Sequence, residues 1–203
     1  MSTRSIFTAA LVAAALSAPA LLAATPAGAQ TPRAQGPLAK NRQALPTEPG
    51  VYPLRKDGSW VLGLRRMENN VASCFAGVGN PQQQVFEYMS FNVGLSMFRF
   101  LGPELAEVEN NAELRIILRI DAGENRGMVG RMINGAATFP VDDASEAKRA
   151  LIRALADGRT LYVHDARGQR IGQFPLDGAR TILTAFGPCK GKLPPAPKNI
   201  QAQ

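Results

Sequence analysis

Residues able to act as a catalytic base or nucleophile are few in this chain. His164 is the only histidine, and no serine stands in a Gly-x-Ser-x-Gly sequence. A hydrolase triad needs a nucleophile, a base and an orienting group, and a nucleophile elbow carries that glycine-flanked serine. His164 belongs to an alternating segment whose inward positions are Leu161 and Val163, so we expect it beside Tyr162 on the solvent side. The sequence predicts no catalytic triad.

Carboxylates are the remaining candidates for acid–base chemistry. Glu104, Glu107 and Glu109 stand close together, and Asp142 is followed by Asp143. Two carboxylates facing each other across a cleft can hydrolyse a glycosidic bond. The simpler interpretation is that the glutamates lie on a solvated surface and the aspartates at the start of a helix. We therefore expect no catalytic residue, and keep a small periplasmic glycan-active hydrolase that uses acidic residues as the alternative.

The sequence indicates neither a metal site nor a cofactor. One histidine and scattered acids provide no ligand spacing for zinc or calcium. Thioethers bind cuprous ions, but the methionines of the domain stand in apolar segments, where methionine fills gaps in a core. These are Met89, Met97, Met128 and Met132. Gly77-Val78-Gly79 lacks the third glycine of a phosphate loop and starts no helix, so it is interpreted as a turn.

A set of arginines is the surface feature with a clear binding chemistry. Arg115 and Arg119 project from one face of a strand-like segment, residues 114–120, and Arg131 comes from the next segment. Guanidinium groups bind carboxylate and phosphate through paired hydrogen bonds. If the strand register makes the three arginines neighbours, they form an anion site. Otherwise they form a charged sheet face that prevents aggregation.

The N-terminus has the features of a secretory signal peptide. A short basic start, residues 1–4, precedes an alanine-rich apolar run at Ile6–Leu16 and a small-residue cleavage site at Ala27-Gly28-Ala29. We expect a Sec-type signal at residues 1–29 and a periplasmic or secreted protein, with no transmembrane segment after cleavage. The net charge of the full chain is +7. In an exported protein this charge indicates an envelope protein or an anionic envelope component as the partner, not nucleic acid; the alternative is that the charge only keeps the protein soluble. The oligomeric state is left open.

Cys74 and Cys189 are the only cysteines. In an oxidising compartment two cysteines pair by default, and no Cys-x-x-Cys spacing suggests a redox role. We expect one disulfide that closes most of the domain into a loop, worth about 4–5 kcal/mol in the chain-entropy model.

Composition divides the rest of the chain into three parts. We expect residues 30–50 to form a flexible proline-rich leader, residues 51–189 a single domain, and residues 190–203 a flexible basic tail. Period-two alternation predicts several strands, with residues 85–101 forming either two strands or one bent strand. The predicted strands also include residues 60–65, 71–76, 114–120 and 128–133.

Two helices and a hairpin follow these strands. Asp143 is expected to cap a helix that ends at Gly158, and Asp177 a helix that ends at Gly187-Pro188, just before Cys189. Residues 160–174 between them are predicted to form a hairpin. This order predicts an α+β domain, with an antiparallel sheet and both helices packed on it. A sandwich-like β domain with two helices is the alternative.

The second half of the domain resembles a known family. It has a helix ending in Arg153–Arg159, strands at Leu161–Val163 and Ile171–Pro175, and a closing helix at Leu176–Phe186. This arrangement resembles the exported proteobacterial domains of the invasion-associated locus B type, although the further cysteines usual in that family are missing. The resemblance implies an exported, non-enzymatic domain, and no functional residue is carried over.

The sequence therefore predicts an exported, non-enzymatic binding or interaction module of the bacterial periplasm or cell envelope. A structural component of a larger envelope assembly is a further possibility.

Overall fold

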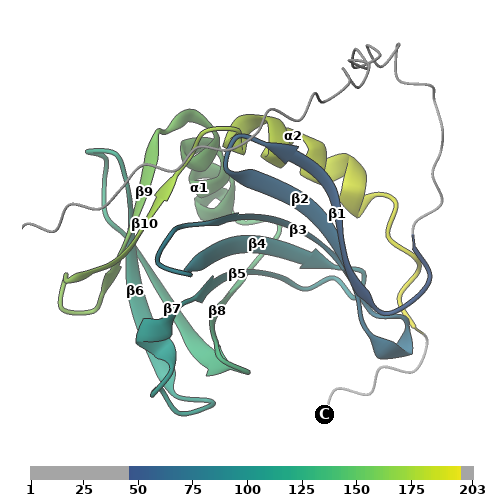
Figure 1. The fold of residues 1–203 in the computed structure, drawn as a ribbon, viewed down its shortest axis with the longest axis horizontal. Helices are drawn as coiled ribbons and strands as arrows, with labels where there is room; N and C mark the ends of the chain where they lie inside the picture. The colour runs from purple at the N-terminus through teal and green to yellow at the C-terminus, as the bar shows by residue number, and fades with distance from the viewer. Residues whose placement is uncertain (1–45, 198–203) are drawn as a thin grey trace, which may run out of the picture. The chain divides into compact units, whose positions relative to one another are not determined.

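The domain is a ten-stranded antiparallel sheet with two α-helices packed on it (Figure 1). The computed structural model describes residues 46–197. The expected signal peptide, residues 30–45 of the leader and residues 198–203 of the tail lie outside this range. In chain order the elements are β1 (Gly50–Asp57), β2 (Trp60–Arg66), β3 (Ala72–Gly79), β4 (Val85–Phe91), β5 (Ser96–Leu101), β6 (Glu113–Ile120), β7 (Arg126–Ile133), β8 (Ala136–Val141), α1 (Glu146–Asp157), β9 (Thr160–Asp165), β10 (Arg170–Pro175) and α2 (Ala179–Lys190). Two short 3-10 turns, Glu68–Asn70 and Pro103–Leu105, join strands.

The strand order is β1-β2-β3-β4-β5-β8-β7-β6-β9-β10. Every pairing is antiparallel, which confirms the expected α+β class. The ambiguous region, residues 85–101, forms two strands joined by a tight turn in which Gly94 has a φ of 81°. That conformation suits glycine, which carries no Cβ.

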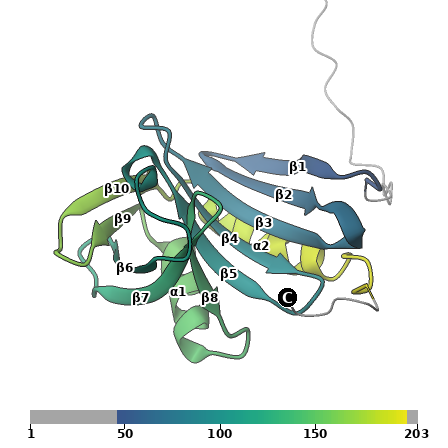
Figure 2. The same cartoon turned by 90° about the horizontal axis from the view of Figure 1, so that it is seen from below.

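Side-chain alternation gives the sheet two different faces. One face packs under the helices and holds the aromatic core, including the fully buried Trp60, Phe86, Phe98, Phe139 and Phe174. We call the opposite side the helix-free face. In Figure 2, α2 lies behind β2 to β5, and no α-helix covers the near side of these strands.

The first and last parts of the sheet meet across the core. The ring centroid of Phe174 on β10 lies 6.2 Å from that of Phe86 on β4 and 6.2 Å from that of Phe100 on β5. The indole nitrogen of Trp60 on β2 donates to the carbonyl of Pro175 at 3.1 Å. Burial of these large rings stabilises the domain because each ring removes a large apolar area from water.

The strand β1 was not predicted from the sequence. It is an edge strand that pairs only with β2, and its register is interrupted between Pro53 and Arg55. Most of its side chains are exposed, so no apolar alternation marks it. Proline and charged residues are common on edge strands because they discourage pairing with another chain.

Both predicted helix caps are wrong. The side chain of Asp143 binds Lys148 and Lys190 instead of the first amides of α1, whose N-cap residue is Ser145. The carboxylate of Asp177 accepts a hydrogen bond from the backbone N–H of Ser59 at 3.0 Å. In both cases a partner distant in sequence takes the oxygen that was expected to cap the helix.

The helix α2 also ends later than predicted, because it continues through Gly187-Pro188 to Lys190. Proline removes one helical hydrogen bond, but the last turn is held on the sheet by a disulfide. Cys189 lies in that turn and is bonded to Cys74 on β3, with Cα atoms 6.1 Å apart, so the expected disulfide is confirmed. The following residues also contact the domain, since Asn92 donates to the carbonyls of Pro194 and Pro195. None of the helices in residues 46–197 combines the length and apolar character needed to cross a membrane.

Candidate functional site

The register of the sheet separates the three arginines that the sequence singled out. Arg115 and Arg119 lie on the helix-free face of β6, as expected. Arg131 on β7 lies opposite Glu113 and is only a diagonal neighbour of Arg115. Arg119 lies beyond the last β6–β7 pair, and its neighbour on the other side is Tyr162 on β9. Arg119 therefore belongs to a different surface from Arg131.

Tyr162 is the centre of the first of these surfaces. The guanidinium carbon of Arg119 lies 5.4 Å from the centroid of the Tyr162 ring, and that of Arg170 lies 5.9 Å from it. Both distances are within the range of cation–π attraction. An open hollow of about 660 Å³ adjoins the ring, and we call it the Tyr162 hollow. Its lining residues are Arg119, Asp121, Ala122, Arg159 and Tyr162.

The positive charge of the Tyr162 hollow is not neutralised by its single acid. Asp121 accepts hydrogen bonds from the backbone N–H groups of Arg159 and Thr160 at 2.9–3.2 Å, so its oxygens fix the loop between strands. Within residues 46–197, neither Arg119 nor Arg159 nor Arg170 forms an ion pair. Cations without an acidic partner attract anions from solution.

His164 lies next to Tyr162 on the same face, as the alternation predicted, with ring centroids 6.5 Å apart. Leu161 and Val163 point into the core and are fully buried. The Nδ1 atom of His164 and the Nε atom of Arg119 are buried and have no hydrogen-bond partner in residues 46–197. No serine lines the Tyr162 hollow, so His164 has no nucleophile there to activate.

Arg131 belongs to a cross-strand row farther along the helix-free face. The register runs Glu87–Arg99–Thr138–Arg131–Glu113 across β4, β5, β8, β7 and β6. At the β4 end, the carboxylate of Glu87 lies 2.6 Å from Nη1 of Arg99 and 3.7 Å from Nη2 of Arg65. Burial lowers the pKa of the Arg99 guanidinium, and the nearby Glu87 carboxylate opposes this effect.

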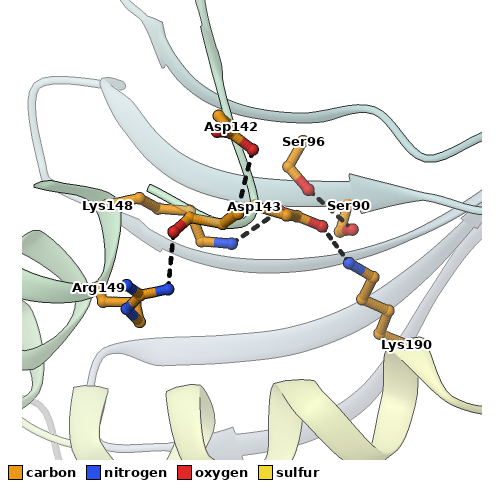
Figure 3. Close-up of polar contacts among 8 residues, drawn as sticks. Ser90, Ser96, Asp142, Asp143, Lys148, Arg149 and Lys190 are labelled. Atoms are coloured by element: carbon orange, nitrogen blue, oxygen red, sulfur yellow. Dashed lines mark hydrogen bonds and ion pairs between the residues drawn. The ribbon is translucent and has the colours of Figure 1, made fainter. Parts of the chain in front are cut away.

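A second polar cluster joins the ends of the two helices to the sheet (Figure 3). Asp143 lies between the ammonium groups of Lys148, at the start of α1, and Lys190, at the end of α2. Partial burial favours the neutral form of Asp143, but hydrogen bonds from the two lysines and the nearby Ser96 hydroxyl outweigh it and hold its pKa well below the usual range. The cluster fixes α1 against α2.

The same cluster contains serine and lysine, a combination that some hydrolases use for nucleophilic catalysis. Ser96 and Ser90 are bonded to each other at 2.9 Å, and both are buried under the helices. Partial burial lowers the pKa of Lys148, but hydrogen bonds to Asp143 and Tyr88 outweigh burial and raise it. A buried serine next to a protonated lysine is not an accessible nucleophile with a base, so the cluster is structural.

The carboxylates considered for glycan hydrolysis are dispersed. Glu104 lines a polar hollow of about 580 Å³ together with Gln84 and Arg170, and it accepts a hydrogen bond from Gln84 at 2.5 Å. Glu107 and Glu109 are exposed and do not line that hollow. Asp142 accepts a hydrogen bond from the amide of Ala144. Each of four hollows in the described part of the chain is lined by at most one carboxylate.

The four methionines considered as copper ligands do not lie together. Met89 and Met97 face each other on the helix-free face of β4 and β5, whereas Met128 and Met132 lie on the core face of β7. Met89 is fully buried, and its sulfur accepts hydrogen bonds from Arg65 and Arg99. In residues 46–197 no three His, Cys, Asp or Glu side chains lie close enough to hold a metal ion.

Sequence reasoning did not group Arg159 and Arg170 with Arg119 around Tyr162. The contact between Arg119 and Tyr162 depends on the pairing of β6 with β9, which are separated by two strands and a helix in the chain. A local signal was present, since Tyr162 and His164 alternate with buried residues and so place two rings on the exposed side of a strand.

Compared with known proteins, the chain matches no family model, no curated protein and no solved structure. Its function is therefore inferred from its own residues.

Proposed function

We propose that this protein is an exported, non-enzymatic binding module of the bacterial periplasm or cell envelope, and that the Tyr162 hollow binds an anionic envelope component. The observation that carries the proposal is a group of three arginines without an ion pair in the described part of the chain. The guanidiniums of Arg119 and Arg170 lie near the Tyr162 ring, and Arg159 lines the hollow beside that ring.

The chemistry of these side chains suits phosphate and carboxylate groups. Guanidinium presents several N–H donors in one plane, and charge-assisted hydrogen bonds to oxyanions are about twice as strong as neutral ones. Arg119 is oriented by its contact with Tyr162, which reduces the side-chain entropy lost on binding. The open form of the hollow suits the headgroups of a surface better than a small enclosed molecule.

The rest of the proposal follows the chain's export features. The expected signal peptide places the protein where anionic lipids and glycans are present, and the resemblance of residues 153–186 to invasion-associated locus B domains agrees with a non-enzymatic exported role. The localisation is tested by N-terminal sequencing of the protein from its host envelope, for which we expect Gln30 as the first residue. An intact N-terminus would contradict it.

Vesicle binding tests the hollow directly. The mature protein is sedimented with vesicles of phosphatidylglycerol or of phosphatidylcholine at low and at high salt. We expect binding to the anionic vesicles only, weakening as salt rises. The double variant Arg119→Gln/Arg170→Gln should bind at least tenfold more weakly, because each arginine near an anionic surface contributes about 1 kcal/mol.

A matched variant distinguishes binding at the Tyr162 hollow from attraction by the overall positive charge of the protein. Arg153→Gln/Arg180→Gln removes the same charge from the exposed surface of α1 and α2, and it should bind almost as well as the wild type. Equal losses in the two double variants would show non-specific attraction and overturn the proposed site. Equal binding to both lipids would overturn the anionic partner.

A further inference from the structure

A separate pocket lies on the helix-free face, away from the Tyr162 hollow. It has a volume of about 290 Å³, just below the usual range of about 300–1,000 Å³ for small-molecule sites, and we call it the Arg65–Arg99 pocket. Its lining residues are Arg65, Met67, Phe91, Met97, Arg99, Ile133, Asn134 and Thr138. They come from β2, β4, β5, β7 and β8 and from the segments next to them, so one pocket depends on the register of five strands.

One wall of the pocket is cationic. Arg65 and Arg99 share a single acid, Glu87, whose side chain is only 5% exposed. Glu87 is bonded to Nη1 of Arg99 at 2.6 Å, but its contact with Nη2 of Arg65 is 3.7 Å, too long for a hydrogen bond. Two guanidiniums against one carboxylate leave one positive charge, together with N–H donors of Arg65 that have no oxygen partner in residues 46–197.

A buried hydroxyl group next to Arg65 also lacks a hydrogen-bond partner in residues 46–197. Ser73 is paired in the register with Arg65 on one side and with Phe91 on the other, and it is fully buried. Its hydroxyl has no hydrogen-bond partner in the described part of the chain. A buried polar atom without a partner costs free energy and needs an explanation.

The other wall is apolar and open to solvent. Met67 and Ile133 are among the exposed large hydrophobic residues, Ile133 at 42%. Phe91 and Met97 are half-buried beside them. Apolar side chains placed at the mouth of a charged pocket gain free energy when an apolar group covers them.

We infer that the Arg65–Arg99 pocket binds a small organic carboxylate with an apolar tail of several carbons. The carboxylate pairs with the guanidinium of Arg65, which has the free donors, and the tail covers Met67, Met97 and Ile133. An inorganic anion would leave the apolar wall uncovered, and a neutral apolar molecule would leave the positive charge without a partner. The site is independent of the Tyr162 hollow, since the two share no lining residue.

The test uses the mature protein labelled with ¹³C at its methionine methyl groups, and octanoate as the probe. Met67 and Met97 line the pocket, whereas Met128 and Met132 lie on the core face of the sheet and serve as internal controls. As octanoate is added, we expect the NMR chemical shifts of the Met67 and Met97 methyl groups to change until they saturate. The methyl signals of Met128 and Met132 should not change. Acetate, which lacks the tail, and 1-octanol, which lacks the charge, should each bind at least tenfold more weakly.

Two variants test the charged wall. Arg65→Gln should weaken octanoate binding at least tenfold, whereas Arg66→Gln should not change it, because Arg66 contacts the carbonyl of Pro46 and does not line the pocket. Ile133→Asp places a carboxylate at the exposed rim and should also abolish binding, with the fold intact. The inference is overturned if octanoate shifts Met128 and Met132 instead, if 1-octanol binds as well as octanoate, or if the Arg65 and Arg66 variants behave alike.

Discussion

Glu87 and Arg99 face each other across β4 and β5, and their ion pair is largely removed from water. A buried ion pair adds little net stability, because the loss of hydration offsets the attraction between the charges. Loss of one partner is costly, since it leaves an isolated buried charge. If Glu87 is lost, the guanidinium of Arg99 keeps its charge without an acidic partner, and the like-charged Arg65 lies beside it.

We therefore predict that Glu87→Gln lowers the free energy of unfolding by about 3–5 kcal/mol, measured by urea denaturation. The double variant Glu87→Gln/Arg99→Met should lose less, because it removes both charges and fills the space with an apolar side chain. Glu68→Gln, at an exposed position, serves as the control and should change stability by less than about 0.5 kcal/mol. A double variant less stable than Glu87→Gln would contradict this account.

The pKa of Asp143 gives a second prediction at the residue scale. Its pKa in the folded protein is lower than the unfolded value of about 3.9, so folding favours the ionised form. The stabilisation is fully present above about pH 5 and is lost as the pH falls through 3.9 toward the folded value.

We expect Asp143→Asn to be less stable than the wild type by roughly 1–2 kcal/mol near neutral pH, and this difference to shrink steadily below pH 4. Urea denaturation of both proteins from pH 3 to pH 7 measures it. Asp142→Asn, whose carboxylate contacts only a nearby amide, is the matched control. A difference that does not change with pH would show that Asp143 acts through its shape and not its charge.

At the scale of elements, the entry to α2 is fixed by Gly178. Its φ is 83°, in the left-handed region, and a Cβ at this position would overlap the carbonyl oxygen of Asp57. Gly168, in the turn between β9 and β10, has a φ of 80° but open space around it. The two glycines therefore separate backbone strain from close packing.

We predict that Gly168→Ala costs about 1 kcal/mol of unfolding free energy, the usual penalty for a residue with a Cβ in this conformation. Gly178→Ala should cost about 3 kcal/mol or more, because β1 and the start of α2 must also move apart to relieve the overlap with Asp57. Thermal and urea denaturation measure both changes. Similar losses in the two variants would mean that the contact with Asp57 is not important.

The strands and helices also show which parts of the fold could be predicted from the sequence. Strands such as β2 and β6 were predicted because burial on one face leaves a local alternation that can be read directly. The caps failed because Asp143 and Asp177 are bound by Lys190 and Ser59, residues brought near only by the complete fold. The Tyr162 hollow was hidden for the same reason, since it depends on β6 pairing with β9.

At the scale of the whole molecule, the described residues divide their tasks between the two faces of one sheet. The face under the helices contains the aromatic core, the disulfide and the Asp143 cluster. The helix-free face carries the arginines of the Tyr162 hollow and of the Arg65–Arg99 pocket. The packed core on one side holds the charged residues of the other side at fixed distances. This favours binding, because the side chains lose little conformational entropy when a ligand binds.

The disulfide links the sheet covalently to α2, because it joins β3 to the last turn of that helix across a sequence separation of 115 residues. We predict that Cys74→Ser/Cys189→Ser lowers the free energy of unfolding by about 2–5 kcal/mol. Exchange of the backbone amide hydrogens should become faster first in the last turn of α2. This turn includes Lys190, whose contact with Asp143 depends on it. Reduction of the wild type should reproduce both effects, and the reductant should leave the double variant unchanged. If the variant matches the oxidised wild type in stability, the core alone holds α2 on the sheet and the bridge is dispensable.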